Sequence, residues 1–318
     1  MLVCVIFGVS GCATPKLKLF SDETDPLKEF TLLGHKKEKV LLIPVKGFIS
    51  DEPRREFLKP KPSMVQEIVS QLQRAEKDKN IRAVLLKIDS PGGSTTASDI
   101  LYHEILEYKK RTNVKVVAAM MNLATSGGYY VSLPADFIIA HPTTVTGSIG
   151  VIFIYPQITG LMGKIGLDVE VSKSGKNKDM TSPFRKPTEE ERRILENITE
   201  TLGRRFVDLV TENRKISSAT AEKISTARVF LPEEALELGL IDKVGYLGDA
   251  ISKAKTLADI PEDAKVVVYR RTKYPDDNLY NTSTSQYGVR NTPFLDLGIA
   301  KDFASLRTGF YYLWMPGD

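Results

Sequence analysis

Cysteine and histidine are scarce in this chain. Among its 318 residues there are two cysteines, Cys4 and Cys12, and three histidines, at positions 35, 103 and 141. Both cysteines lie in the first dozen residues, so the sequence beyond them can form no disulfide and no cysteine metal site. The histidines are too scattered for a persuasive metal cluster. We therefore expect neither a bound metal nor a cofactor.

An excess of charge of one sign is also lacking. The chain has 44 Lys and Arg against 40 Asp and Glu, a net charge of +4, and the two signs are interleaved along it. This excludes the basic stripe that is typical of a nucleic-acid-binding protein. The remaining composition, 42% hydrophobic and 26% charged, is that of an ordinary globular protein. The length fits one large domain with appendages, or two domains.

The N-terminus lacks an apolar run long enough to cross a bilayer, which needs about 20 residues. Residues 2–9 are apolar or small and suit the central region of an export signal. The following Ser10-Gly11-Cys12 resembles the bacterial lipobox, in which the cysteine becomes lipidated. The alternative is an apolar terminus with a chance cysteine. We favour an export signal over residues 1–12, with Cys12 as the lipidation site.

Two other stretches differ in composition and hydrophobic pattern from the central part of the chain. Residues 13–39 are polar, charged and without pattern, which predicts a tether. Residues 261–318 form a predicted C-terminal extension, partly flexible because residues 274–292 are rich in Asn, Ser, Thr and Asp. The extension ends in an apolar stretch over residues 310–316, which we expect to dock on the rest of the protein.

Between these stretches, two strand–turn–helix units follow one another. A strand over 81–89 leads through Ser90-Pro-Gly-Gly-Ser94 to a helix over 96–108. A second strand over 116–121 leads through a turn that contains Ser126 to a helix over 129–133. Successive units of this kind are typical of a parallel α/β sheet. We therefore predict an α/β fold in which the two glycine turns meet at the carboxyl ends of the strands.

The second turn has the residues of a nucleophile site. It presents the hydroxyl of Ser126 at the start of a helix, where free amides favour negative charge. Gly93 and Gly127 can then donate two backbone N–H groups to one oxyanion. The alternative is a glycine-rich turn that merely joins two core elements.

A serine hydroxyl needs a base, and the residues alone leave two candidates open. One is His141, which follows a predicted strand over 137–140. The other is a lysine in the loop over 174–179, which contains Lys176 and Lys178. A lysine acts as a base only when neutral, so its pKa has to fall from about 10.4 to near 7–8. Ser148 could then hold the amine in place.

Periodicity and capping patterns predict the other elements. Helices are expected behind Ser63, from Thr188 to about residue 210, and over 249–257. Strands are expected over 40–45, 169–171, 240–244 and, at the edge of the sheet, 266–269.

Five motifs in order resemble a known family. They are Asp89-Ser-Pro-Gly-Gly-Ser94, Ala124-Thr-Ser-Gly-Gly-Tyr-Tyr130, Thr146-Gly-Ser-Ile-Gly-Val151, Gly175-Lys-Asn-Lys-Asp179, and the stretch from Ala227 to Asp242. Together they resemble the signal peptide peptidase A family, also called protease IV, of the S49 serine peptidases. The resemblance implies a peptidase domain over 40–260 with a Clp protease/crotonase-like fold, in which parallel sheets are flanked by helices.

The resemblance also implies which residues act. Ser126 matches the nucleophile, Lys178 the general base, Gly93 and Gly127 the oxyanion hole, and Ser148 the hydroxyl beside the lysine. It favours Lys178 over His141, for which no acidic partner is evident. It further implies that the chain self-associates into a ring in which the Ser–Lys dyad is shared between subunits.

The resemblance predicts a serine endopeptidase that hydrolyses apolar peptides, such as cleaved signal peptides, at the membrane surface. Its expected location is the bacterial cell envelope, with the protein anchored to the membrane and its catalytic domain outside the cytoplasm. Two alternatives use the same fold. One is an acyl-CoA enzyme of crotonase type, and the other is a membrane-bound scaffold that has lost proteolysis.

Overall fold

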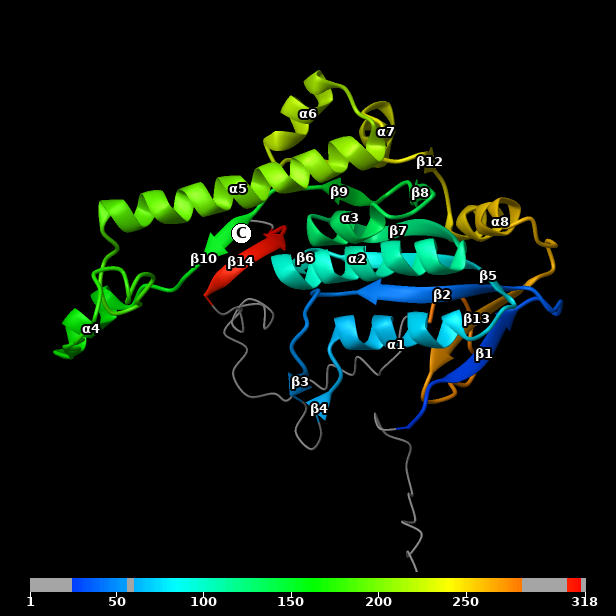
Figure 1. Cartoon of the computed structure of the whole chain (residues 1–318), viewed down its shortest axis with the longest axis horizontal. Coiled ribbons are helices and arrows are strands. Elements are labelled where there is room, and N and C mark those ends of the chain that lie inside the picture. Colours follow the sequence, from blue (N-terminus) through cyan, green and yellow to red (C-terminus); the bar gives the residue numbers. More distant parts are fainter. Residues whose placement is uncertain (1–24, 56–59, 282–307, 316–318) are drawn as a thin grey trace, which may run out of the picture.

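A twisted and largely parallel sheet forms the centre of the molecule (Figure 1). The computed structural model describes residues 25–55, 60–281 and 308–315. Neighbouring strands in the sheet follow the order β1 (Lys28–Leu33), β13 (Lys265–Arg270), β2 (Lys39–Lys46), β5 (Ile81–Ser90), β7 (Lys115–Thr125), β8 (Phe137–Ala140) and β12 (Lys243–Val244). From β13 to β12 adjacent strands are parallel, and β1 pairs antiparallel to β13. The predicted α/β class is confirmed.

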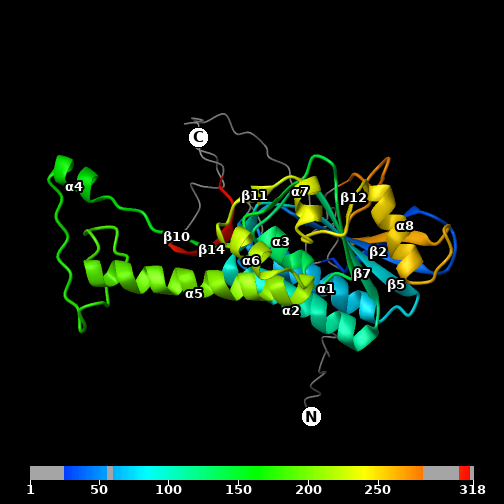
Figure 2. The same cartoon turned by 90° about the horizontal axis from the view of Figure 1, so that it is seen from above.

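Helices cover both faces of this sheet, which explains why its central strands are almost continuously apolar. On one face lie α1 (Met64–Glu76), α2 (Thr95–Thr112), α3 (Gly127–Ser132) and part of α5 (Glu189–Arg214). The other face is covered in part by α8 (Leu247–Leu257), as Figure 2 shows. Side chains alternate along each strand, so β5 sends Leu86 and Ile88 to the first core and Ala83 and Leu85 to the second.

Two predicted capping patterns fix the starts of the helices that carry the most sequence signal. The hydroxyl of Ser63 accepts a hydrogen bond from the amide of Gln66 at 3.1 Å and begins α1. Thr188 and Glu191 cap each other at the start of α5, with the Glu191 amide 3.2 Å from the Thr188 hydroxyl and the Thr188 amide 2.8 Å from the Glu191 carboxylate. Both predicted helix starts are therefore confirmed, with the reciprocal capping box at α5 and the single Ser63 cap at α1.

A long arm extends beyond the sheet. The chain leaves β9 (Val145–Gly147) and β10 (Ile152–Ile154), forms α4 (Thr159–Ile165), and returns through a loop into α5. In Figures 1 and 2, α4 and this loop lie at one end of the molecule, past the first turn of α5, and α3 lies in the body. After α5 the chain forms α6 (Ser218–Ser225), β11 (Val229–Phe230), which pairs with β9, and α7 (Pro232–Glu237).

The arm contradicts one sequence prediction. The expected strand over 169–171 is wrong, because these residues lie in the loop after α4 with no regular structure. Val169 and Val171 are 43% and 49% exposed, so the alternating pattern has no neighbouring strand to pair with. The helix α4 was not predicted.

Segments on both sides of the predicted 40–260 domain join the sheets. β1 lies inside the predicted tether, and β13 lies between β1 and β2 rather than at the sheet edge that we expected. The apolar C-terminal stretch does dock on the body: β14 (Gly309–Leu313) lies between β10 and β6 (Gly92–Ser94) and is antiparallel to both. β3 (Arg54–Arg55) pairs antiparallel with β4 (Pro60–Lys61).

The predicted export signal and its Cys12 lie outside the described residues. Within the described ranges, none of the helices combines the length and the apolar character needed to cross a membrane.

Candidate active site

Ser126 occupies a strained turn between β7 and α3. Its φ of 51° and ψ of −114° are unusual for a residue with a side chain. Its amide donates to the carbonyl of Gly147 at 2.7 Å, and its carbonyl accepts from the amide of Tyr130 at 2.9 Å. The side chain is 1% exposed, and its Oγ has no hydrogen-bond partner among the described residues. Buried hydroxyls usually have a hydrogen-bond partner, so the lack of one sets Ser126 apart from most other buried hydroxyls of the described residues.

The two predicted oxyanion glycines lie together. A Cβ added to Gly127 would lie 3.1 Å from the Gly93 amide nitrogen and 3.1 Å from the Gly92 Cα, so neither turn has room for a side chain. On β6, the Gly92 carbonyl and the Ser94 amide bond to Ile49 at 2.9 Å each. Because backbone groups alternate along a strand, the N–H of Gly93 faces the opposite side, toward β14.

Ser148 directly follows β9, the strand whose Gly147 carbonyl accepts a hydrogen bond from the Ser126 amide. β9 pairs with the end of β7 so that Gly147 lies opposite Thr125. Ser148 has a φ of 52°, is 8% exposed, and donates its amide to the Arg228 carbonyl at 2.8 Å. The structure therefore brings Ser148 into the neighbourhood of Ser126 through the β7–β9 register.

Neither predicted base reaches the Ser126 hydroxyl within one chain. Lys178 is exposed and lies in the loop between α4 and α5, where its amide donates to the Gly175 carbonyl at 3.1 Å. That loop is at the far end of the arm from α3 (Figures 1 and 2). The Nδ1 of His141 lies 2.9 Å from the Thr143 hydroxyl, and its ring packs edge-on against Tyr246 at 5.1 Å.

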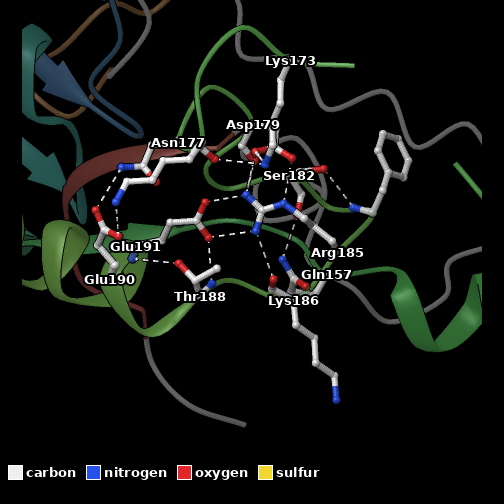
Figure 3. Close-up of polar contacts among 12 residues, drawn as sticks. Gln157, Lys173, Asn177, Asp179, Ser182, Arg185, Lys186, Thr188, Glu190 and Glu191 are labelled. Atoms are coloured by element: carbon white, nitrogen blue, oxygen red, sulfur yellow. Dashed lines mark hydrogen bonds and ion pairs between the residues drawn. The ribbon is translucent and has the colours of Figure 1, made fainter. Parts of the chain in front are cut away.

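The loop that carries Lys178 is held by a network that sequence reasoning did not anticipate (Figure 3). Arg185 donates to both carboxylate oxygens of Asp179 at 2.7 Å and to the Glu191 carboxylate at 2.8 Å. Lys173 donates to Asp179 at 2.7 Å. Hydrogen bonds from Arg185 and then Lys173 hold the pKa of Asp179 well below its usual range, and Arg185 lowers the pKa of Glu191 to about 2. The capping box is the one sequence signal that pointed to Glu191.

The C-terminal strand runs along the same glycines. Tyr312 lies opposite Gly93 and Leu313 opposite Gly92, and the Trp314 amide donates to the Pro91 carbonyl at 2.9 Å. A Cβ added to Gly92 would collide with the Tyr312 carbonyl oxygen and would lie 2.8 Å from the Gly127 amide nitrogen. The backbone of β14 therefore passes over the point where the two glycine turns meet.

An aromatic cluster receives the Tyr312 side chain. Its ring stacks on Tyr130 at 5.0 Å with an interplanar angle of 20° and packs against Phe206 of α5 at 4.8 Å. Tyr130 and Phe206 also contact each other at 4.8 Å. Tyr130 belongs to α3, which begins directly after Ser126, so one ring of the cluster is carried by the same turn and helix as the candidate nucleophile.

Comparison with protein families gives two matches. The model for peptidase family S49 matches residues 108–261, and the model for Clp protease matches residues 59–145. The Clp match agrees with the predicted type of fold.

Individual relatives extend the match over most of the chain. A "Putative signal peptide peptidase SppA" from Enterococcus faecium is 31% identical over 277 residues, which cover 86% of this chain and 80% of that protein. "Protease 4" from Haemophilus influenzae is 30% identical over 88% of this chain, which spans 44% of that longer protein. Among solved structures, a mutant of the 1510-N membrane-bound stomatin-specific protease aligns with 76% of this chain and 100% of its own, at 18% identity and a TM-score of 0.46.

The motifs around Ser126 and the family match lead to the same conclusion. The similarity to the Enterococcus faecium protein over 86% of this chain, together with the family model, shows that this chain belongs to peptidase family S49 and is a serine peptidase.

Proposed function

We propose that Ser126 is the nucleophile of this peptidase and that Lys178 from a neighbouring copy of the chain is its general base. One observation carries the proposal: the Ser126 hydroxyl is buried and unpartnered in the described structure, beside the paired glycine turns. A nucleophilic serine needs a base within hydrogen-bond reach. Because this chain places neither Lys178 nor His141 on the hydroxyl, a second copy is the natural source.

The arm has the surface expected of a part that contacts another copy. Exposed large apolar side chains gather on α4 and the loop behind it: Leu161 at 61%, Ile165 at 65%, Leu167 at 50%, Val169 at 43%, Val171 at 49% and Phe184 at 43%. Apolar clusters of this kind are uncommon on the free surface of a soluble monomer. Closed rings of identical subunits bury such surfaces by head-to-tail contacts. A homo-oligomeric ring would bring the Lys178 of one subunit toward the Ser126 of the next.

In the proposed mechanism, the neutral amine of Lys178 takes the proton of the Ser126 hydroxyl. The oxygen attacks the carbonyl carbon of a peptide bond, and the N–H groups of Gly93 and Gly127 stabilise the oxyanion. The protonated Lys178 then donates to the leaving amine, so the acyl-enzyme forms as the peptide bond breaks. Water, deprotonated by Lys178, releases the acyl group. The Ser148 hydroxyl orients the amine throughout.

The position of β14 supports an extended apolar peptide as the substrate. An antiparallel strand laid on β6 presents its backbone to Gly93, and its side chain opposite Gly93 enters the cluster of Tyr130 and Phe206. Binding by strand addition recognises the backbone, and the cluster selects an apolar or aromatic side chain. A peptide that displaced β14 and took the same position would place its carbonyl at the Gly93 and Gly127 amides.

We further propose that the substrates include cleaved signal peptides at the membrane of a bacterial cell envelope. The support is the similarity to the Enterococcus faecium protein, whose printed name is "Putative signal peptide peptidase SppA". In this proposal a lipidated Cys12 anchors the protein, and the catalytic domain lies outside the cytoplasm. Such peptides are apolar, as the aromatic cluster requires.

Hydrolysis of an apolar, internally quenched peptide tests the proposal. We expect Ser126→Ala and Lys178→Ala each to lose at least 100-fold in kcat, because each removes one half of the dyad. His141→Ala is the matched control and is expected to keep wild-type kcat. Activity that survives in Lys178→Ala and is lost in His141→Ala would overturn the choice of base. Full thioester turnover by Ser126→Ala would instead favour the acyl-CoA alternative, and no turnover by the assembled wild type would favour a scaffold.

A further inference from the structure

Asp179, the residue directly after Lys178, carries a carboxylate that would stabilise a neighbouring ammonium. Its charge is taken up by other cations: two oxygens accept from Arg185 at 2.7 Å each, and Lys173 donates at 2.7 Å. The Asp179 side chain is 12% exposed, and its partners Arg185 and Lys173 are 29% and 33% exposed. The side chain of Asp179 therefore has little capacity left for Lys178.

Arg185 also connects the loop to α5. Its guanidinium lies between Asp179 and Glu191, as Figure 3 shows, and the Glu191 side chain is 1% exposed. The planar fork of an arginine can serve two carboxylates at once, which a lysine ammonium cannot do with the same geometry. Because Glu191 also caps α5, Arg185 holds the Lys178 loop to a fixed point of the helix.

A second ion pair joins this loop to α5. Lys176 donates to Glu190 of α5 at 2.7 Å, and both side chains are more than half exposed, at 74% and 52%. Glu190 is thereby neutralised, as Asp179 is by Arg185 and Lys173. Asp179, Glu190 and Glu191 thus each have a cationic partner other than Lys178.

We propose that Arg185 is a positioning residue for catalysis: it withholds the Asp179 carboxylate from Lys178 and fixes the loop that delivers the amine. This inference rests on the proposed role of Lys178 as general base. A base that must be neutral gains from the removal of a nearby free carboxylate, because an opposite charge within a few ångströms favours the protonated form. Arg185 thereby extends the pH range over which the base is active toward lower pH.

The pH profile of kcat/KM tests this role. In Arg185→Gln, Asp179 keeps only the hydrogen bond from Lys173, so its less compensated carboxylate favours the ammonium form of Lys178, and we expect the acidic limb of the profile to move up by about one pH unit. Adding Asp179→Asn to that variant removes the carboxylate, and the limb is expected to return to its wild-type position. A purely structural role of Arg185 would lower kcat without shifting the acidic limb of the pH profile, and adding Asp179→Asn would not restore activity. An unmoved limb, or a shift that persists in the double variant, overturns the inference.

Two further variants keep the test sharp. Arg185→Lys retains a cation beside buried Glu191, which protects the fold, and is expected to give a smaller shift in the same direction. Lys176→Gln removes the same charge from the same loop but leaves the Arg185–Asp179 pair intact, so its limb is expected to stay in place. A limb shift in Lys176→Gln equal to that in Arg185→Gln would show a general charge effect and would overturn the proposal.

A measurement without catalysis separates this inference from the proposed function. In the full chain with Ser126→Ala, the rate of Lys178 acetylation by acetic anhydride is followed against pH by peptide mass spectrometry. Adding Arg185→Gln is expected to require about one pH unit more for the same rate. If that shift occurs while Lys178→Ala remains active, the proposed base is wrong but the pairing inference holds. If Lys178→Ala is inactive and acetylation is unshifted, the inference fails and the base assignment stands.

Discussion

A shared dyad makes a quantitative prediction for mixed oligomers. In the proposed dyad, each active site takes one residue from each of two subunits, because Ser126 directly precedes α3 and Lys178 lies in the loop between α4 and α5. A chain with Ser126→Ala still donates a lysine, and a chain with Lys178→Ala still donates a serine. Mixed in one ring, the two inactive variants therefore rebuild complete sites wherever the correct neighbours meet.

The size of the recovery follows from counting neighbours. If the fraction of one variant is f, a site receives a wild-type serine and a wild-type lysine with probability f(1 − f), whatever the ring size. At equal amounts about one quarter of the sites are complete, so we expect about a quarter of wild-type kcat per site. If both residues came from one chain, the recovery would be zero.

Co-expression followed by peptide hydrolysis measures this recovery, with subunit composition determined by intact-mass spectrometry. The matched control mixes wild type with the double variant Ser126→Ala/Lys178→Ala. A shared dyad then gives activity that follows the square of the wild-type fraction, about a quarter at equal amounts, whereas a dyad within one chain gives about half. Zero recovery in the first mixture together with a linear dependence in the second would refute subunit sharing.

Three further predictions follow from the packing around the site and the sheet. Gly127→Ala places a methyl group 2.5 Å from the Ser98 hydroxyl. The oxyanion amides then shift, and kcat in the peptide assay is expected to fall by about 100-fold. The control Gly203→Ala, whose added methyl group has nothing within 4 Å, is expected to keep wild-type kcat. Burial, followed by repulsion from a second lysine, lowers the pKa of Lys87 from 10.5 to about 8, so Lys87→Met stabilises the fold by about 2–3 kcal/mol at pH 7. Between about pH 8 and pH 10.5 the folded chain binds fewer protons than the unfolded chain, so the stability of the wild type rises with pH over this range. Urea titrations are therefore expected to show that the extra stability of Lys87→Met vanishes by pH 10.5. Extra stability that stays constant with pH would contradict the lowered pKa of Lys87. A synthetic peptide with the sequence of residues 309–315 is expected to inhibit hydrolysis competitively. The same peptide with alanine in place of Tyr312 is expected to have a Ki at least 10-fold higher. Equal Ki values for the two peptides would rule out the aromatic cluster as a binding site.

Local sequence patterns were enough to predict the part of the fold that surrounds the nucleophile. The buried strands β5 and β7 are continuous apolar runs, and each ends in a glycine turn, so their parallel arrangement and the meeting of Gly93 with Gly127 could be foreseen. The caps of α1 and α5 were equally readable, because capping depends on residues three positions apart.

The sequence predicted a strand over 266–269 and the docking of residues 310–316, but it did not predict which strands they pair with, and it did not predict β1. β1, β13 and β14 join their sheets through partners far away in the chain, and no local period encodes such a contact. The expected strand over 169–171 failed for the same reason, because alternation without a partner makes no strand. Arg185 had no distinctive spacing, since its two carboxylates meet only once the loop has folded on α5.

The role of Lys178 came from resemblance rather than from pattern. A lysine in a polar loop is by default a solvated surface residue, and the exposed loop in this chain has that appearance. In the proposed dyad the amine meets a serine of another chain, and a local sequence pattern does not encode such a contact. The assignment therefore depends on chemistry measured in the assembled protein.

The reaction of Ser126 with a fluorophosphonate tests the central claim most directly, because it reports the nucleophilicity of one hydroxyl without any substrate preference. We predict that the assembled wild type is labelled at Ser126, that Ser126→Ala is not labelled, and that Lys178→Ala is labelled at least 100-fold more slowly. Labelling of Lys178→Ala at the wild-type rate would contradict activation of Ser126 by Lys178.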